Sequence, residues 1–278
     1  MPMIYLIQSF IITVYQDCAL FANLQECDIL EIMDKTILIA GKDIPAGSDF
    51  AVAVAVKGRT TIVTATPAEK NEPITENGYT AFAWNRASAL SARTVLLSCL
   101  NISNRLDEAV LVFDEPLLAE AFNHSDLTEN ARVMDELVVG YQYLTQEILS
   151  RFAQKKATEE NALIKKLVFL HKTNPSQADV AANPALRSGA VSSPMVSAAA
   201  AAFRAFAENI AAVYAENETL YPVLITCDAA NDLAHKDSAL ASWLCDYLDS
   251  IDELKKRPVA KQLTGWIKAG TKKAGGWF

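Results

Sequence analysis

The stretch that decides the fold is Thr36-Ile37-Leu38-Ile39-Ala40-Gly41-Lys42-Asp43-Ile44-Pro45-Ala46-Gly47. Its first five residues are β-branched or apolar and predict a buried strand. Two glycines and a proline then indicate a turn, and the pattern from about Ala46 to Lys57 predicts a helix. A strand, a glycine-bearing turn and a helix are typical of the first unit of a parallel sheet covered by helices.

The same alternation of strand and helix continues along the chain. Strands are predicted over 60–65, 79–84, 109–113, 166–170 and 223–226, and helices over 88–103, 128–154, 193–216 and 239–254, with a polar loop over 67–78. No internal repeat is visible. We therefore predict an α/β fold with a doubly wound parallel sheet, Rossmann-like and three-layered (α/β/α), in a single domain.

Composition narrows the class of protein. The chain has 278 residues, of which 51% are hydrophobic and 21% charged, so disordered and fibrous classes are excluded. At ~150 residues per domain, this length allows one large or two small domains. The formal net charge of -8 repels phosphate backbones, so no nucleic-acid partner is predicted.

Three parts differ in composition. Residues 1–32 are an N-terminal extension, apolar at first and acidic later, with no Lys or Arg before Lys35. They lack the cationic start of a secretory signal, and charges interrupt them too often for a spanning helix, so membrane spanning is not predicted. An accessory helix and a wrongly assigned start are the two interpretations. Residues 33–254 are the predicted domain, and residues 255–278 are a basic C-terminal tail.

Cysteines and histidines indicate neither disulfides nor a metal. Five cysteines are odd in number and widely spaced, which predicts free buried thiols and a cytoplasmic protein. They are Cys18, Cys27, Cys99, Cys227 and Cys245. His124, His171 and His235 lie far apart in the chain, so no metal site is predicted.

The order and spacing of these elements resemble the short-chain dehydrogenase/reductase superfamily over nearly the whole of residues 33–254. That family opens with a strand, T-G-x-x-x-G-x-G and a helix; here Gly41 and Gly47 match the first and last glycines, while Pro45 replaces the middle one. Residues 104–114 are similar to the family's G-R-L-D-x-L-V-N-N-A-G. They keep Arg-Leu-Asp and lose N-N-A-G.

The resemblance implies an NAD(P) cofactor, and Gly41, Gly47 and Asn85 stand at its binding positions. Other positions argue against binding of NAD(P). Thr66 ends the second strand, where the family has an acid for NAD or an arginine for NADP. The carboxylates after the fourth strand also disfavour cofactor phosphates. The prediction is therefore either no cofactor or NAD(P).

The family's catalytic residues are a tyrosine base, a lysine four residues later, a serine and an asparagine on a helix. Those positions hold Val196, Ala200, Lys172 (or Thr173) and Leu137. A shift of one residue substitutes Met195 and Ala199 for the first two. Neither alignment supplies a phenol or an amine, so we predict no catalytic residue of the family type.

Polar residues at the predicted carboxyl edge of the sheet offer an alternative site. They are Asp114, Glu115, His171, Lys172, Thr173, Ser192 and Ser193. Either they form a binding or hydrolytic cluster, or they are ordinary polar loop residues. The chain lacks the G-x-S-x-G elbow at any strand-to-helix turn, which disfavours a serine hydrolase.

Two further features concern partners. The resemblance implies a homo-oligomer through the helices near 128–154 and 193–216, the second of which carries the alanine run 198–202; a buried intrachain helix is the alternative. The tail has seven cations and no acid after Glu253. It is expected either to fold back over the subunit or to bind an anionic partner such as a membrane surface, an acidic protein or a polyanion.

We therefore expect a catalytically degenerate protein related to the short-chain dehydrogenases, acting as a binding, regulatory or scaffold module. The alternative is a divergent NAD(P)-dependent oxidoreductase that uses other residues. Docking through the tail is a third, non-enzymatic possibility.

Overall fold

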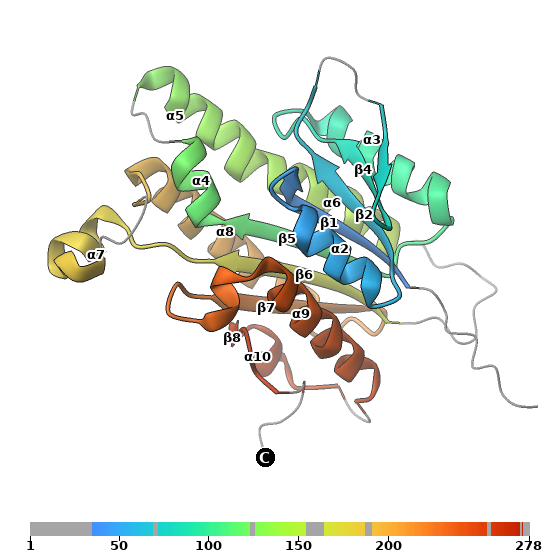
Figure 1. Cartoon of the computed structure of the whole chain (residues 1–278). Helices are drawn as coiled ribbons and strands as arrows, with labels where there is room; N and C mark the ends of the chain where they lie inside the picture. The colour runs from blue at the N-terminus through green and yellow to red at the C-terminus, as the bar shows by residue number, and fades with distance from the viewer. Residues whose placement is uncertain are drawn as a thin grey trace, which may run out of the picture. The chain divides into compact units, whose positions relative to one another are not determined.

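Eight strands form one sheet in the order β3-β4-β2-β1-β5-β6-β7-β8 (Figure 1). The computed structural model describes residues 35–68, 72–122, 126–153, 164–186, 191–254, 257–272 and 274. The strands are β1 (Thr36–Ile44), β2 (Thr60–Ala65), β3 (Ile74–Glu76), β4 (Tyr79–Ala83), β5 (Glu108–Asp114), β6 (Lys165–Lys172), β7 (Leu220–Cys227) and β8 (Ile267–Lys268). All neighbouring pairs are parallel except β3 with β4.

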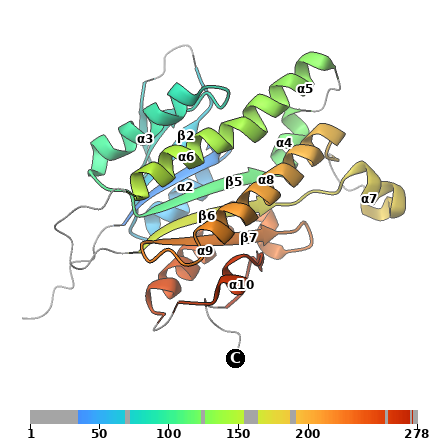
Figure 2. The same cartoon turned by 180° about the vertical axis from the view of Figure 1, so that it is seen from behind.

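Helices cover both faces of this sheet (Figures 1 and 2). They are α2 (Ser48–Val56), α3 (Ala89–Ser103), α4 (Glu115–Ala121), α5 (Leu127–Val133), α6 (Gly140–Phe152), α7 (Gln177–Ala182), α8 (Pro194–Val213), α9 (Asp237–Asp252) and α10 (Ala260–Leu263), with short turns η1 (Met134–Val139), η2 (Pro184–Leu186) and η3 (Asp232–His235).

Strand β1 shows why three layers form. Ile37 and Ile39 point into the core under α2 and α9, whereas Leu38 and Ala40 point into the core under α3, α6 and α8. Successive side chains of a strand alternate between faces, so a continuous apolar run needs helices on both sides. The predicted doubly wound, three-layer α/β fold is confirmed.

The first turn differs from the prediction. We expected the strand to end at Ala40, but β1 continues through Gly41 to Ile44, with a register irregularity between Ile39 and Ile44. Gly41 has φ +95°, a conformation that only glycine adopts readily. The turn is therefore displaced to 45–47, and α2 begins at Ser48.

Other boundaries also differ. The predicted loop over 67–78 contains β3, an edge strand antiparallel to β4. The predicted helix over 128–154 is three segments, since the π-helical turn η1 separates α5 from α6. Helix α4 was not predicted: Asp114 caps it through the amide of Leu117, and Pro116 lies in its first turn.

The described part of the tail folds back over the domain, which confirms that alternative for residues 257–272 and 274. Its strand β8 pairs with β7, and Arg257 donates hydrogen bonds to the carbonyls of Tyr214, Ala215 and Leu220. The sheet thus continues past the predicted boundary at residue 254. The extension 1–32, Cys18, Cys27 and His124 lie outside the described residues.

Helix α8 is long and apolar enough, by length and composition, to cross a membrane. Here Val196, Phe203 and Ala207 are buried in the core against the sheet. The apolar residues of α8 therefore pack in the core of this domain.

Candidate functional site

The two glycines of the predicted cofactor turn face the protein's own atoms. A Cβ built on Gly41 would lie 2.2 Å from the Val112 carbonyl oxygen and 2.4 Å from the Tyr141 hydroxyl. A Cβ on Gly47 would lie 2.0 Å from the Lys42 carbonyl oxygen. Both glycines therefore allow close approach of the chain to itself, with no open cradle for a pyrophosphate beside them.

Arg86 fills the space next to Gly41. Its guanidinium donates to the Gly41 carbonyl at 3.0 Å and to the Asp43 carboxylate at 2.7 Å, and it lies 5.1 Å from the centre of the Trp84 ring. Asn85, the third predicted cofactor residue, is exposed, and its side-chain oxygen accepts from the Ala87 amide at 3.1 Å. Asn85 therefore serves the local turn.

A buried phenol lies at the same place. The Tyr141 hydroxyl donates to the Val112 carbonyl at 2.5 Å and accepts from Arg86 at 3.4 Å. Burial raises the pKa of Tyr141 to about 12, although the charge of Arg86 acts in the opposite direction. The phenol is thus neutral at pH 7, and it is not the activated tyrosine that the family mechanism uses.

Two lysines and two aspartates form a closed group at the carboxyl edge, here named the carboxyl-edge quartet: Lys42, Asp114, Lys172 and Asp237. Lys42 contacts Asp114 and lies 2.7 Å from Asp237; Lys172 lies 3.3 Å from Asp237 and 3.6 Å from Asp114. Burial lowers the pKa of Lys42, but the two carboxylates outweigh it and raise the pKa above its usual value. The quartet is formally neutral, and both carboxylates hold Lys42 more closely than Lys172.

Glu115, His171 and Ser192 of the predicted rim cluster form a buried chain of hydrogen bonds. Glu115 accepts from Ser192 at 3.0 Å and lies 2.6 Å from His171, whose other ring nitrogen is 3.4 Å from Arg204. The carboxylate stands between the serine and the histidine. Nucleophilic activation requires the base next to the serine, so this order does not support a hydrolase. Glu115, His171 and Ser192 are all buried. The two alternatives, a binding cluster and ordinary polar residues, both stay predictions for them.

The residues predicted to stand at the family's catalytic positions lie mostly in the core. Val196 and Leu137 are fully buried, and Ala200 is buried as well, all in the core that α8 shares with the sheet. Lys172 belongs to the quartet. Ser193 caps α8 by accepting from the Val196 amide at 3.3 Å. Within the described ranges, no three His, Cys, Asp or Glu residues are grouped so as to hold a metal.

The fit to NAD(P) is therefore poor. The side chain of Arg86 and the hydroxyl of Tyr141 occupy the surroundings of Gly41, and the neighbouring Lys42 is paired with two carboxylates. Sequence reasoning missed Lys42, Arg86 and Tyr141. For Lys42 and Arg86 the available signal was a cation two positions after a predicted apolar strand, but the partner of each could not be identified from the sequence.

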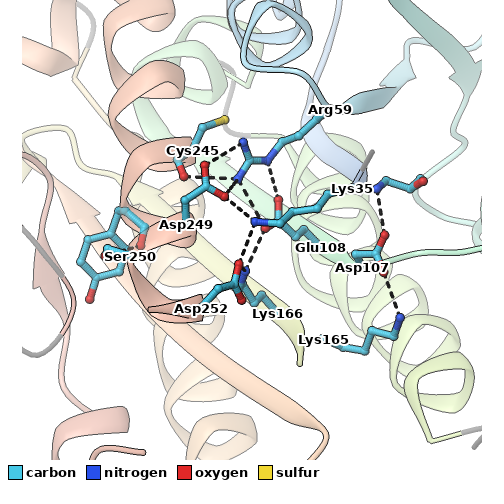
Figure 3. Close-up of polar contacts among 12 residues, drawn as sticks. Lys35, Arg59, Asp107, Glu108, Lys165, Lys166, Cys245, Asp249, Ser250 and Asp252 are labelled. Atoms are coloured by element: carbon cyan, nitrogen blue, oxygen red, sulfur yellow. Dashed lines mark hydrogen bonds and ion pairs between the residues drawn. The ribbon is translucent and has the colours of Figure 1, made fainter. Parts of the chain in front are cut away.

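A second charged group, the amino-edge cluster, lies at the opposite edge of the sheet (Figure 3). Its members are Lys35, Arg59, Glu108, Lys166, Asp249 and Asp252. Helix α9 ends with two of these acids and no basic residue in its last turn, which the helix dipole disfavours. Three cations offset that cost: Lys35 and Arg59, which directly precede β1 and β2, and Lys166 of β6. This cluster joins α9 to the sheet and is structural.

Asp107 beside this cluster predicts acid sensitivity. Burial would raise its pKa, but hydrogen bonds from Arg105, the Thr36 amide and Lys165 lower it below the usual value. A carboxyl with a lower pKa in the folded state stabilises the protein above its unfolded pKa, and that stability is lost as the pH falls through the folded pKa. We expect the free energy of unfolding, measured by urea titration, to fall steeply below about pH 4.

The variant Asp107→Asn should flatten this pH dependence, while the exposed Asp246→Asn should leave it unchanged. Equal slopes in the parent and Asp107→Asn would show that Asp107 does not carry the effect.

Comparisons with known proteins agree with this architecture. No protein-family model matches the chain. A protein of Treponema pallidum (strain Nichols) described as uncharacterized is 24% identical over 247 residues, which are 88% of this chain and 96% of that protein.

Solved structures of similar arrangement are reductases and dehydrogenases. A 3-oxoacyl-[acyl-carrier protein] reductase from Brucella melitensis in complex with NAD has a TM-score of 0.56 and 16% identity, covering 85% of this chain and 95% of its own. A short chain dehydrogenase from Mycobacterium smegmatis has a TM-score of 0.55 and 13% identity, with coverages of 86% and 93%. A short chain dehydrogenase from Mycobacterium avium has a TM-score of 0.56 and 15% identity, covering 88% of this chain and 86% of its own. The chain therefore has the fold of the short-chain dehydrogenases/reductases.

Proposed function

We propose that this protein is a catalytically inactive binding module built on the short-chain dehydrogenase fold, which works without NAD(P). The observation that carries the proposal is the occupied surroundings of Gly41, where Arg86 and Tyr141 stand. The apolar residues Val196 and Ala200 at the tyrosine and lysine positions support it independently. Hydride transfer by the family mechanism has no proton donor in this arrangement.

Cofactor titration tests this proposal. Addition of NADH or NADPH, followed by isothermal titration calorimetry, is expected to give no saturable binding up to about 1 mM. An active short-chain reductase measured alongside serves as the positive control. Saturable micromolar binding of either dinucleotide would overturn the proposal and favour a divergent NAD(P)-dependent oxidoreductase.

We further propose a cytoplasmic homo-oligomer. Cys99, Cys227 and Cys245 are free and buried, as in proteins of reducing compartments. The outward side of α8 carries exposed Ala198, Ala201 and Ala205, whose small side chains let a second copy approach closely. Helices α6 and α8 remain the proposed contact. An anionic partner for the basic tail stays a prediction.

A further inference from the structure

A cavity of about 440 Å³ opens at the carboxyl ends of β6 and β7. Its walls come from α4, from the loop after β6, and from η2 and η3 with the loop between β7 and η3. This volume lies within the range of small-molecule sites and accommodates a ligand of modest size. It lies beside the quartet residue Lys172.

The lining combines an apolar wall with a few polar groups. Pro175, Leu186, Ala230 and Ala234 are among the apolar contributors, and Leu186 is 40% exposed there. The polar groups are Lys172, Thr173, Asn174, Glu120 and His235. A mostly apolar wall with few convergent polar groups is the usual composition of a specific small-molecule site.

Lys172 keeps hydrogen-bonding capacity for a ligand. Its ammonium has three N–H donors and makes one hydrogen bond, at 3.3 Å to Asp237, while Asp114 is 3.6 Å away. Lys42 takes the closer contacts with both carboxylates. Lys172 is therefore the less tightly held cation of the quartet, and it is the one that borders the cavity.

Thr173 and Glu120 add a hydroxyl and a carboxylate. The Thr173 amide donates to the Cys227 carbonyl at 2.9 Å, whereas its hydroxyl makes no hydrogen bond within the part of the chain that the structure describes. Glu120 is exposed on α4 and forms no ion pair with any other described residue. Both groups can contact a ligand in the cavity without losing an existing partner.

Charge balance selects the class of ligand. Around the cavity, Lys42 and Lys172 are matched by Asp114 and Asp237, and Glu120 adds a further negative charge. A purely anionic ligand would be repelled by this extra negative charge, and a purely cationic ligand would be repelled by Lys172. A zwitterion satisfies Lys172 and Thr173 through its carboxylate and Glu120 through its ammonium.

We propose that this cavity binds a small zwitterion with a short apolar body, of the α-amino-acid type. The inference rests on the proposed function, since it gives the cofactor-free binding module its ligand class. The carboxylate accepts from Lys172 and Thr173, the ammonium donates to Glu120, and the side chain packs on the apolar wall that includes Leu186 and Ala234.

The test uses L-leucine as the probe, with 4-methylpentanoate as the analogue lacking the ammonium and 3-methylbutylamine as the analogue lacking the carboxylate. Calorimetry on the full chain is expected to give saturable leucine binding, and binding of each analogue at least about tenfold weaker. No saturable leucine binding up to about 10 mM, or equal affinity for an analogue, would overturn the inference.

Two variants locate the site. Thr173→Val keeps the side-chain shape, and Glu120→Gln keeps the size; each is expected to weaken leucine binding about tenfold. The exposed Glu218→Gln, which precedes β7 at the opposite edge, is the control and should bind leucine as the parent does. Unchanged leucine binding in both cavity variants would refute the placement of the leucine site in this cavity.

The dinucleotide titration keeps the two proposals apart. A chain that binds neither leucine nor NAD(P)H overturns only the ligand class, whereas saturable dinucleotide binding overturns the proposed function itself.

Discussion

Replacing Glu108 with glutamine is expected to lower the free energy of unfolding by about 3–5 kcal/mol. The Glu108 carboxylate is fully buried, 2.7 Å from the Arg59 Nε and 3.2 Å from the Lys166 Nζ. The neutral amide would leave these two buried cations without their shared counter-charge. Asp249 and Asp252 would still contact Arg59 and Lys166, but both of these acids are partly exposed, so each cation loses its buried counter-charge.

Urea titration followed by circular dichroism measures this loss, and thermal unfolding should shift by roughly 10 °C for a domain of this size. Asp246→Asn is the matched control. It removes the contact at 2.6 Å between Lys57 and Asp246, whose side chains are 33% and 63% exposed, and should cost at most about 1 kcal/mol. Similar losses in Glu108→Gln and Asp246→Asn would contradict the assignment of the amino-edge cluster as the stabilising one.

Replacing Gly41 with alanine is expected to destabilise the domain by about 3–5 kcal/mol. Two effects combine at this position. The backbone has φ +95°, which strains an L-residue, and the new methyl group would meet the Val112 carbonyl and the Tyr141 hydroxyl well inside contact distance. Neither the buried backbone of β5 nor the packed Tyr141 ring can withdraw without breaking their mutual hydrogen bond.

Gly58→Ala separates the two effects. Gly58 has φ +79°, but a Cβ there would meet nothing within 4 Å, so only backbone strain of about 1–2 kcal/mol is expected. Chemical denaturation of the two variants compares them directly. If Gly41→Ala were no less stable than Gly58→Ala, the space beside Gly41 would be open, and the argument against a bound dinucleotide would fail.

Much of the fold was predictable because its determinants are local. The run Ile37 to Ala40 contributes alternately to two cores, and the β2 strand has the predicted bounds. Periodicity of this kind involves residues two to four positions apart, so it can be recognised without knowing the tertiary structure. The turn after β1 was not predicted correctly, since Gly41 was interpreted as a turn residue although it serves close packing inside the strand.

For the candidate site, residue identities could be predicted from the sequence, but contacts between distant residues could not. The identities of Val196 and Ala200 are properties of the sequence, and the prediction that they replace the family's tyrosine and lysine rests on the alignment of the sequence alone. By contrast, nothing near Arg86 in the sequence indicates that it would bond to Gly41, 45 residues earlier. Asp114 and Glu115 were expected to repel phosphates, but the pairing of Asp114 with Lys42 was not foreseen.

The sequence by itself determined the alternation of strands and helices and the short-chain dehydrogenase arrangement. Only the tertiary structure decided which charges are buried together. Arg59 and Asp249 are 190 residues apart, and their contact exists because β2 and the end of α9 meet at one edge of the sheet. Apolar burial is non-directional and tolerates many partners, so a pattern predicts it, whereas a buried charge needs one particular partner at hydrogen-bond distance.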